Sequence, residues 1–561
     1  MQFLPAHSRC VLRFQRRALG SPVPAHRHVP LLDSKIPSCS ELEAIGGKVP
    51  VTITGKFPEK YFKKNATVEV TPVLRWENGE AKGQPASFQG EKVQGNDQTI
   101  SYKAGGTYTM KASFDYVPEM AKSELYLDFK IQKGSKTYTI PSVKIADGVL
   151  ATSELPTVAS ASAANGVDAY QRIIKQAQEA QIMFLIQQAN LRSSELRAED
   201  LKEFHKKVAA VNGDTKNFKL NNIEISAYAS PDGGVKLNSG LAEQRQNNTE
   251  KYLNRQLKKG KITTTVDTKY TAQDWEGFQE LVSKSNLQDK DLILRVLSMY
   301  SDPEQREAEI KNISSVYKTL ADEILPQLRR ARLIANYEHI GRSDEEINAA
   351  FDSDASALSV EELLYAATLT NDNARKAAIY NKAIQLYPND FRAYNNLGVM
   401  AYNSDKATAA KYFKQAANKD ANAPEVNTNL GLIELVNGNV ANAETYLSKS
   451  AGAETSNEAL GNLYIKQGQY ERAVNAFGDV KSNSAALAQI LAKDYNKAKN
   501  TLNGVANADA YTHYLMAIVG ARTNNAGLVK SSMKKVAEED AALAAKAVND
   551  REFAKYANEI K

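Results

Sequence analysis

The feature that most constrains the fold is a repeat that begins at about Ser359. A leucine recurs there at intervals of 34, 33 and 30 residues, and the last three leucines are each followed by a glycine. Further along each unit comes an alanine, and four residues later a phenylalanine or leucine. The recurring positions are Leu363, Leu397, Leu430 and Leu460; Gly398, Gly431 and Gly461; Ala409, Ala443 and Ala473; and Phe413, Leu447 and Phe477. A period of this length predicts stacked supersecondary units, because one unit alone cannot bury its apolar stripe.

These positions resemble the tetratricopeptide repeat, in which small residues let two antiparallel helices pack closely. The resemblance implies an all-α solenoid over residues 346–561, with a concave groove that docks a protein or peptide. A spacer or a dimer surface is the alternative interpretation. On the family pattern, the residues that line the groove are Asn395, Val399, Tyr402, Thr428, Leu432, Leu435, Glu458, Asn462 and Ile465.

Residues 43–150 alternate between apolar and polar with period two, which is typical of strands with one buried face. One such run extends from Tyr108 to Tyr116 and another from Leu125 to Ile131, followed by a hairpin turn at Lys133-Gly134-Ser135. This region is predicted to form a small β-sandwich. Residues 151–166 are small, polar and without periodicity, so they predict a flexible linker.

The next region alternates strands and helices. Strands are expected at Ile182–Ile186, Asn222–Tyr228 and Ile262–Lys269. Helices are expected around Leu201–Val211, with Ser193 and Ser194 as cap candidates, and at about Asn238–Leu257. This order predicts a mixed sheet with helices on one face.

The segment Ile223–Leu253 resembles the core of the OmpA-like C-terminal domain, the peptidoglycan-binding module of Gram-negative envelopes. Asn238–Arg245 is similar to the N-x-x-L-S-x-x-R start of a helix in that family, and Leu328–Leu333 resembles its final strand. The resemblance runs from Ile182 to Ile340. It implies an OmpA-like α/β sandwich over residues 167–345, with a helical insertion at 273–327.

In that family, an aspartate and an arginine clasp the diaminopimelate of peptidoglycan, since an amino-acid-like end needs both a carboxylate and a guanidinium. Arg245 occupies the arginine position, and the uncharged Ser230 occupies the aspartate position, with Asp232 two residues later. The candidate wall clasp is therefore Ser230, Asp232 and Arg245. The alternative is that Arg245 forms a surface ion pair with Glu243 or Asp232.

The charge distribution argues against nucleic-acid binding by residues 43–561. The net charge is +6, but residues 1–42 hold six basic and two acidic groups, which leaves the remaining chain close to neutral. This first segment also holds both cysteines and reads as an atypical leader, either disordered or the product of a misassigned start. A lipid anchor in the true N-terminus is left open. No apolar run approaches the roughly 18 residues of a membrane-spanning helix.

Catalytic motifs are absent from the sequence. It contains no phosphate-binding loop, dinucleotide fingerprint, zinc-protease helix or nucleophile elbow. His205, His339 and His513 have no nucleophile or metal-ligand partner at a suitable spacing. The sequence thus predicts no enzyme activity, catalytic residue, cofactor or metal.

Together, these patterns predict a multidomain α+β protein that acts as an adaptor of the cell envelope. The resemblance implies the periplasm or the periplasmic face of the outer membrane, with envelope proteins or peptides in the repeat groove and peptidoglycan as a candidate ligand. A cytosolic co-chaperone-like scaffold and an accessory to a cell-wall-acting enzyme are the alternatives.

Overall fold

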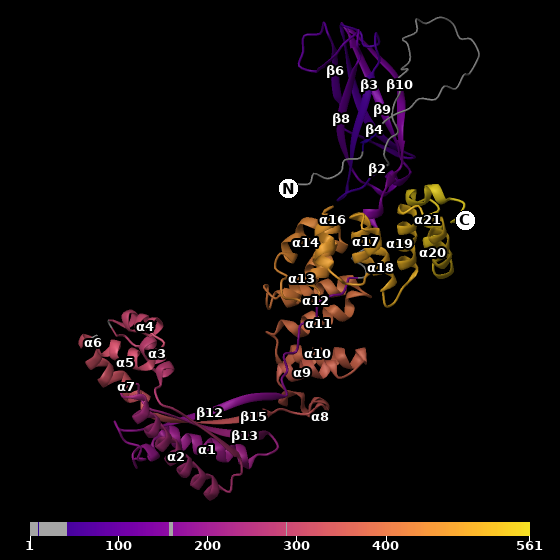
Figure 1. The fold of residues 1–561 in the computed structure, drawn as a ribbon. Coiled ribbons are helices and arrows are strands. Elements are labelled where there is room, and N and C mark those ends of the chain that lie inside the picture. Colours follow the sequence, from indigo (N-terminus) through magenta and orange to yellow (C-terminus); the bar gives the residue numbers. More distant parts are fainter. Residues whose placement is uncertain (1–8, 11–41, 156–160, 288, 313, 561) are drawn as a thin grey trace, which may run out of the picture. The chain divides into compact units, whose positions relative to one another are not determined.

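The computed structural model describes residues 9–10, 42–155, 161–287, 289–312 and 314–560. The chain forms two compact units (Figure 1). Unit 1 combines Met1–Val167 with Asn371–Lys561, and unit 2 is Asp168–Thr370. The predicted leader lies outside the described residues, apart from strand β1 (Arg9–Cys10), which pairs parallel to β3, and Leu42, the first residue of β2.

The N-terminal part of unit 1 is a β domain whose strands carry the predicted alternation. One sheet has the order β1-β3-β8, the other has the order β10-β9-β4-β6-β7 with β5 beside β4, and β11 pairs with β2. The strands are β2 (Leu42–Glu43), β3 (Lys48–Phe57), β4 (Ala66–Trp76), β5 (Gly79–Lys82), β6 (Ala86–Gly90), β7 (Gln98–Ile100), β8 (Gly106–Asp115), β9 (Glu124–Lys133), β10 (Lys136–Asp147) and β11 (Val149–Leu150). A short helix η1 (Pro118–Lys122) connects β8 to β9. Alternate side chains bury one apolar core around Ile53, Val70 and Leu127. The predicted hairpin is confirmed, with Gly134 at a positive φ of 56° in the turn between β9 and β10.

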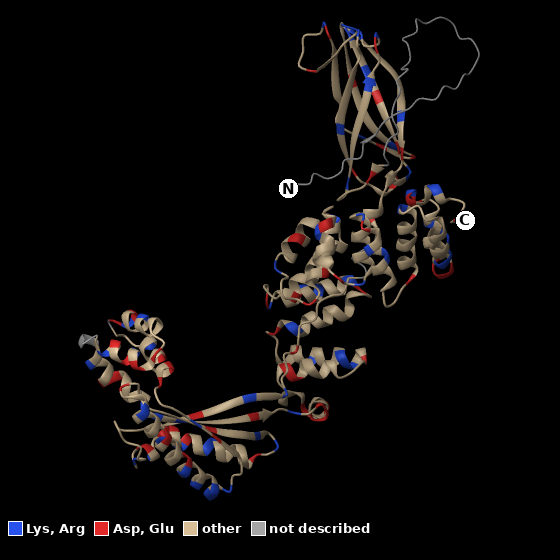
Figure 2. Ribbon diagram, in the orientation of Figure 1, with Lys and Arg blue, Asp and Glu red and all other residues tan. Residues whose placement is uncertain are grey.

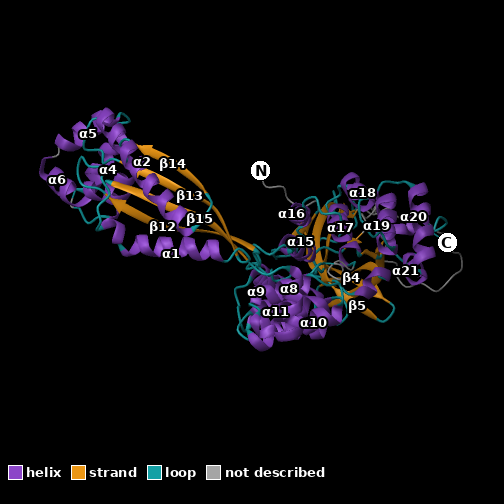
Figure 3. Cartoon of the chain, turned by 90° about the horizontal axis from the view of Figure 1, so that it is seen from below, coloured by secondary structure: helices purple, strands orange, loops and turns teal. Residues whose placement is uncertain are grey.

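Unit 2 contains a four-stranded sheet in the order β12-β15-β13-β14. Its strands are β12 (Ile173–Met183), β13 (Phe218–Tyr228), β14 (Thr265–Thr271) and β15 (Arg330–Ile340). β15 is antiparallel to both of its neighbours, and β13 is parallel to β14. Helices α1 (Glu199–Gly213) and α2 (Val235–Gly260) cover one face of the sheet (Figures 1 and 3).

The first strand of this sheet differs from the expectation. β12 ends at Met183, so Leu185 and Ile186 lie beyond it and are exposed. The strand instead extends over a mostly exposed segment without strict alternation, because β12 pairs with β15 along its whole length, from Ile173 opposite Ile340 to Met183 opposite Arg330. Backbone pairing rather than apolar alternation defines this strand.

The expected caps of α1 are also wrong. The helix begins at Glu199 after Ala198, which offers no side-chain cap, whereas Ser194 precedes the short helix η4 (Glu195–Arg197). The intervening single turn separates the two serines from the start of α1.

A helical subdomain lies between β14 and β15. Its helices are α3 (Trp275–Lys284), α4 (Lys290–Met299), α5 (Pro303–Asn312), α6 (Ser314–Thr319), the π-helical turn η5 (Leu320–Ile324) and α7 (Leu325–Leu328). They bury an apolar cluster of their own around Phe278, Ile293 and Leu328.

Unit 2 ends with α8 (Asp344–Asp354), the turn η6 (Ala355–Ala357) and α9 (Val360–Thr368). Arg342, just after β15, donates to Glu362 on α9 over 2.8 Å, and Tyr170 stacks on Tyr365 with ring centroids 4.7 Å apart. These contacts join α9 to the rest of unit 2, and the unit boundary falls at 370/371, whereas the sequence places the domain boundary at 345/346.

The C-terminal part of unit 1 is all helical. It comprises α10 (Asn373–Leu386), α11 (Phe391–Tyr402), α12 (Lys406–Ala417), α13 (Pro424–Val436), α14 (Val440–Leu447), α15 (Ser456–Lys466), α16 (Tyr470–Phe477), α17 (Asn483–Leu491), α18 (Tyr495–Asn503), α19 (Ala510–Arg522), α20 (Ala526–Glu539), α21 (Ala541–Ala547) and η7 (Arg551–Tyr556). From α11 to α20, consecutive helices pack as pairs.

The repeated glycines allow this pairing. A Cβ atom at Gly398 would lie 2.5 Å from the ring of Phe413, and one at Gly461 would lie 2.5 Å from the ring of Phe477. Gly431 stands in the same relation to Leu447. The small residue on the first helix therefore leaves room for the bulky residue on the second, as the repeat pattern predicts.

Positive and negative side chains are interspersed along the helices of both units (Figure 2). Within the described ranges, no helix is both long and apolar enough to cross a membrane.

Candidate peptide-binding groove

Residues 161–166 of the predicted linker lie as an extended segment against helices α11, α13 and α15 of the repeat region. Figure 1 shows this segment as the thin purple trace beside α11 and α13. It forms no helix or strand, and its hydrogen bonds go to side chains of the repeat helices. Residues 161–166 are thus bound chain rather than part of the flexible connection expected from their composition.

Two asparagines each form hydrogen bonds with both the N–H and the carbonyl group of one residue in this segment. Asn429 on α13 accepts from the N–H of Ala164 over 2.7 Å and donates to its carbonyl over 2.8 Å. Asn396 on α11 does the same for Gly166, over 2.7 and 2.9 Å. A carboxamide has one donor and one acceptor side by side, so it can pair with both polar groups of a peptide residue.

A third asparagine connects these two. Asn395 donates to the carbonyl of Ala164 over 2.9 Å and to Oδ1 of Asn396 over 3.2 Å, and its own Oδ1 accepts from Asn429 over 2.9 Å. All three side chains are buried, and these mutual bonds fix which end of each amide faces the segment. We call Asn395, Asn396 and Asn429 the asparagine clasp.

Glu458 on α15 extends the contact towards the start of the segment. Its carboxylate accepts the backbone N–H of Ser162. Burial raises the pKa of Glu458, and the Ser162 hydrogen bond opposes that rise. The groove therefore contacts the backbone at every second residue, at 162, 164 and 166, which matches the two-residue period of an extended chain.

Only small side chains of the segment are buried. Ala161 and Ala164 are 2% and 1% exposed, and Gly166 is buried as well. Ser162 and Asn165 are exposed to solvent. Ala161 belongs to the apolar cluster of the repeat that also contains Leu432 and Leu435. The groove therefore recognises backbone and admits small residues at its contact positions.

At Gly166 the approach is closest. A Cβ atom there would lie 3.1 Å from Cβ of Arg392 and 3.2 Å from its Cα, and Arg392 also donates to the carbonyl of Val167 over 3.4 Å. A larger residue at 166 would require Arg392 to shift by a few tenths of an ångström.

The nine predicted groove residues fall into two groups. Asn395 and Glu458 contact the segment. The others lie within the helix packing or bond to their own helices: Val399, Tyr402, Leu432, Leu435 and Ile465 in apolar clusters, Thr428 with Pro424 O, and Asn462 with Glu458 O. Their contact with a partner protein stays a prediction.

Sequence reasoning missed Asn396, Asn429 and the segment itself. A signal for the two asparagines exists, because each directly precedes the Leu-Gly pair of its repeat unit, as Asn-Leu-Gly at 396–398 and 429–431. Nothing in the small, aperiodic segment 161–166 indicates which surface it binds.

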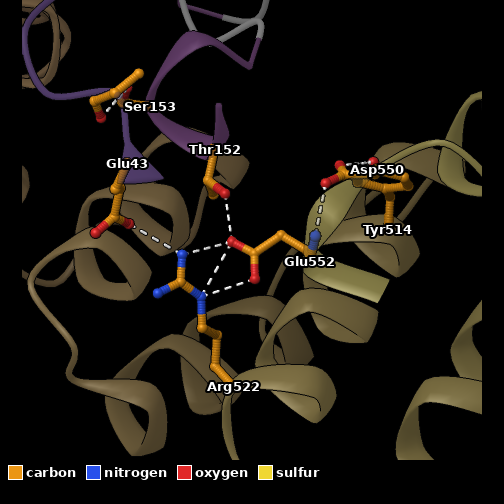
Figure 4. A network of polar contacts seen from close by, with 8 residues as sticks. Glu43, Thr152, Ser153, Tyr514, Arg522, Asp550 and Glu552 are labelled. Carbon is orange, nitrogen blue, oxygen red and sulfur yellow. Dashed lines mark hydrogen bonds and ion pairs between the residues drawn. The ribbon is translucent and has the colours of Figure 1, made fainter. Parts of the chain in front are cut away.

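The start of the linker is held by a buried ionic network (Figure 4). Arg522 on α19 donates to Glu552 over 2.6 and 2.7 Å and to Glu43 of β2 over 3.0 Å. Thr152, in the short helix η2 (Thr152–Glu154), donates its hydroxyl to Glu552, and Ser153 donates to the carbonyl of Ala44 over 2.9 Å. The β domain, the linker and the last repeat helices are thereby fixed to one another within unit 1.

The candidate wall clasp in unit 2 is arranged differently from the expectation. Arg245 is 1% exposed and donates to the carbonyls of Leu185, Gln188 and Tyr228 over 3.2, 3.0 and 2.8 Å. It is not in a surface ion pair, because α2 carries it into the interior, where it holds the loop after β12 against the end of β13. Burial and the nearby Arg329 guanidinium lower the pKa of Arg245 to about 10.

Asp232 and Ser230 lie close together but bond to another arginine. Asp232 pairs with Arg329 over 3.3 Å, Ser230 donates its hydroxyl to Asp232, and Arg329 Nε donates to Ser230 over 3.3 Å. Sequence reasoning placed Arg329 only at the start of the last strand. Binding of a wall ligand by Ser230, Asp232 and Arg245 stays a prediction.

His205, His339 and His513 contact Tyr252, Phe218 and Glu539, respectively. His205 shares a hydrogen bond of 3.0 Å with Tyr252, and burial lowers the pKa of His205. Among the residues that the structure describes, no group of three or more His, Cys, Asp or Glu side chains could hold a metal ion.

No protein-family model matches the sequence, and no curated protein matches it significantly. Similar solved structures include a tetratricopeptide repeat protein from Parabacteroides merdae ATCC 43184, at 12% identity over 39% of this chain and 90% of that chain, with a TM-score of 0.27. PilW, a type IV pilus biogenesis factor, is similar at 15% identity over 35% and 90%, with a TM-score of 0.26. YrrB, a TPR protein with an unusual peptide-binding site, is similar at 19% identity over 30% and 99%, with a TM-score of 0.23.

These TM-scores are all below 0.5, so the description of the helical region rests on its own packing. The paired helices α11 to α20, with a glycine opposite a bulky residue in three successive pairs, resemble a tetratricopeptide solenoid. The chain is thus a mixed α+β protein with an N-terminal β region and a C-terminal solenoid-like region.

Proposed function

We propose that this protein is a non-enzymatic interaction scaffold whose repeat groove binds extended polypeptide through its backbone. The observation that carries the proposal is the pair of bidentate contacts, from Asn429 to Ala164 and from Asn396 to Gly166. Asn396 Nδ2 and Asn429 Oδ1 bond to the backbone of the segment, and leaving a buried polar group unpaired costs about 1–3 kcal/mol.

Amide hydrogen exchange tests this proposal directly. In the full-length protein, the N–H groups of Ala164 and Gly166 should exchange slowly, and the double variant Asn396→Ala, Asn429→Ala should remove that protection. Asn437→Ala is the matched control, because Asn437 is exposed at the end of α13. Equal protection in the double variant would contradict backbone recognition by the clasp.

We further propose that unit 2 associates with the cell wall or with an envelope partner, which places the protein in the cell envelope. The support is the resemblance of residues 223–253 to the OmpA-like core, together with the closeness of Ser230, Asp232 and Arg329 at the end of β13. An aspartate and an arginine side by side can bind the ammonium and the carboxylate of an amino-acid-like ligand.

Sedimentation with purified peptidoglycan sacculi tests the wall contact. Asp232→Asn keeps the shape of the side chain and removes its charge, so it should reduce co-sedimentation of the full-length protein. Arg245→Ala is less informative, because it would also release the carbonyls of Leu185, Gln188 and Tyr228. If wild type and Asp232→Asn remain equally in the supernatant, unit 2 does not bind the wall.

A further inference from the structure

The peptide that occupies the groove in this structure is part of the same chain. The asparagine clasp makes five hydrogen bonds with the backbone of Ala164 and Gly166. Each of these bonds joins a repeat side chain to a main-chain group, and the buried side chains of the segment are small. Nothing in this recognition depends on the segment being covalently attached to the repeat.

The segment can also leave without unfolding a regular element. Residues 161–171 form no helix or strand, so their release would break side-chain contacts but no sheet or helix ladder. The buried portion comprises two alanines and one glycine, which contribute little apolar burial. Its retention therefore depends mainly on the clasp, on Glu458 and on the high local concentration of a tethered segment.

We propose that segment 161–167 is a built-in, displaceable occupant of the groove, and that the groove's external ligand is an extended segment of another protein with the pattern small-x-x-small-x-Gly. This inference rests on the proposed function of the groove and adds the class of its ligand and its regulation. The small positions correspond to Ala161, Ala164 and Gly166. The glycine is favoured because a Cβ atom at 166 would lie 3.1 Å from Cβ of Arg392, so Arg392 would have to shift by a few tenths of an ångström. The x positions face solvent at Ser162 and Asn165, so they can vary.

The tether determines what binding to the intact protein should look like. Because the segment is covalently attached, it competes at a high effective concentration, of the order of millimolar for short linkers. A free peptide must compete with it, so its apparent dissociation constant rises by the inverse of the fraction of open grooves. Wild-type protein should bind such a peptide weakly, and a variant that expels its own segment should bind it at least about tenfold more tightly.

The probe for this experiment is a fluorescein-labelled synthetic peptide, Ala-Ser-Ala-Ala-Asn-Gly-Val-Asp, measured by fluorescence polarisation against the full-length protein. Ala164→Arg should expel the segment, because residue 164 is 1% exposed and has no space for a long side chain. Asn165→Arg is the matched control, since the side chain of Asn165, next to Ala164 in the chain, is exposed to solvent. Tighter binding by Ala164→Arg than by wild type and Asn165→Arg supports the inference, and equal binding by all three overturns it.

Two further measurements separate this inference from the proposed function. Adding Asn429→Ala to Ala164→Arg should abolish the gained binding, and a peptide with Leu in place of the second small residue should not bind. If the Leu peptide binds equally well, the small-residue pattern is wrong even though the groove still binds backbone. If the clasp variants change neither peptide binding nor exchange at 164 and 166, the proposed function itself fails.

Hydrogen exchange on wild-type protein covers the case in which Ala164→Arg does not fold. Saturating peptide should increase exchange at the Ala164 amide of the chain, and unchanged protection would overturn displacement. The source of the ligand is tested by mixing Ala164→Arg with the double clasp variant, whose segment is released. A stable heterodimer would make a second copy of this chain the occupant and overturn the assignment to another protein.

Discussion

At the scale of single residues, the groove depends on a property of asparagine. Its carboxamide offers one donor and one acceptor in the geometry of a peptide group, and the clasp uses both at Ala164 and Gly166. Aspartate would lose the donor, and leucine would lose both groups. The identity of residues 396 and 429 therefore matters more than their size.

Asn429→Ala should destabilise unit 1 by about 1–3 kcal/mol, because the N–H of Ala164 then has no partner from the clasp. Urea unfolding followed by far-ultraviolet circular dichroism measures the change. Asn437→Ala should stay within about 0.5 kcal/mol of wild type, as exposed substitutions usually do. A loss no larger than that of Asn437→Ala would show that the bidentate contact contributes nothing to stability.

Glu458 should give the groove a pH dependence. Its pKa in the folded protein is raised above the ordinary value of 4.5, so the folded state keeps a proton that the unfolded state has lost at the same pH. Its contribution to stability is thus fully present below pH 4.5 and is lost as the pH rises through the folded pKa.

The difference in unfolding free energy between wild type and Glu458→Gln, measured across this pH range, should therefore change in that direction. Glutamine cannot titrate, so the variant supplies the baseline. A difference that is constant with pH would contradict a raised pKa at Glu458.

At the scale of elements, the sequence pattern and the packing agree best in the helix pairs. Gly398, Gly431 and Gly461 each face a bulky residue on the following helix, and local spacing alone indicates both partners. The elements of unit 2 were harder to predict. β12 is mostly exposed and lacks a strict apolar–polar alternation, and it is a strand because β15 supplies hydrogen-bond partners along its whole length.

Gly461→Ala should destabilise the repeat region. Its Cβ would lie 2.5 Å from the buried ring of Phe477, and such overpacking costs about 1–3 kcal/mol, of which the better helix propensity of alanine returns about 1 kcal/mol. The expected net loss is up to about 2 kcal/mol, measured by urea unfolding. Phe477→Leu in the same chain should make Gly461→Ala less costly.

Gly527→Ala is the control for this substitution, since Gly527 is exposed in α20 and a Cβ there has only one neighbour, at 3.5 Å. It should leave stability unchanged or slightly raised. If both alanine variants behave alike, close approach of the helices does not explain the repeated glycine.

At the scale of the whole molecule, unit 1 is held together by contacts between segments that are far apart in the sequence. Arg522 joins β2, near the start of the described chain, to η7 near its end, and Thr152 contacts the same carboxylate across 400 residues of sequence. The β domain and the repeats therefore share one polar network, which also fixes where the linker begins.

Arg522→Ala should reduce the stability of unit 1 by about 3–5 kcal/mol, because it leaves the buried Glu552 carboxylate without its cationic partner. Calorimetry should also resolve separate transitions for the β domain and the repeats. Lys534→Ala is the control, since its ion pair with Glu538 is 76% and 61% exposed and contributes less than about 1 kcal/mol. A single transition at the wild-type temperature would contradict a coupling role for Arg522.

The sequence by itself determined the features that arise from local periodicity. These features are the phase of the helical repeats, the glycines opposite bulky residues and the alternation of the β domain. Each of them depends on residues that lie close together along the chain. The packing role of Arg245 was not predictable in this way, since its partners at Leu185 and Gln188 lie about 60 residues away.

Only the tertiary structure decided that the groove is filled, and by which segment. Ala164 and Asn429 are 265 residues apart, and their contact uses the backbone of one partner. Backbone recognition requires only small residues at the buried positions of the segment, so a run of alanine, serine and glycine reads as a linker until the chain is folded. The physical reason is that every residue carries the same main-chain donor and acceptor, and only the fold selects which of them the asparagines meet.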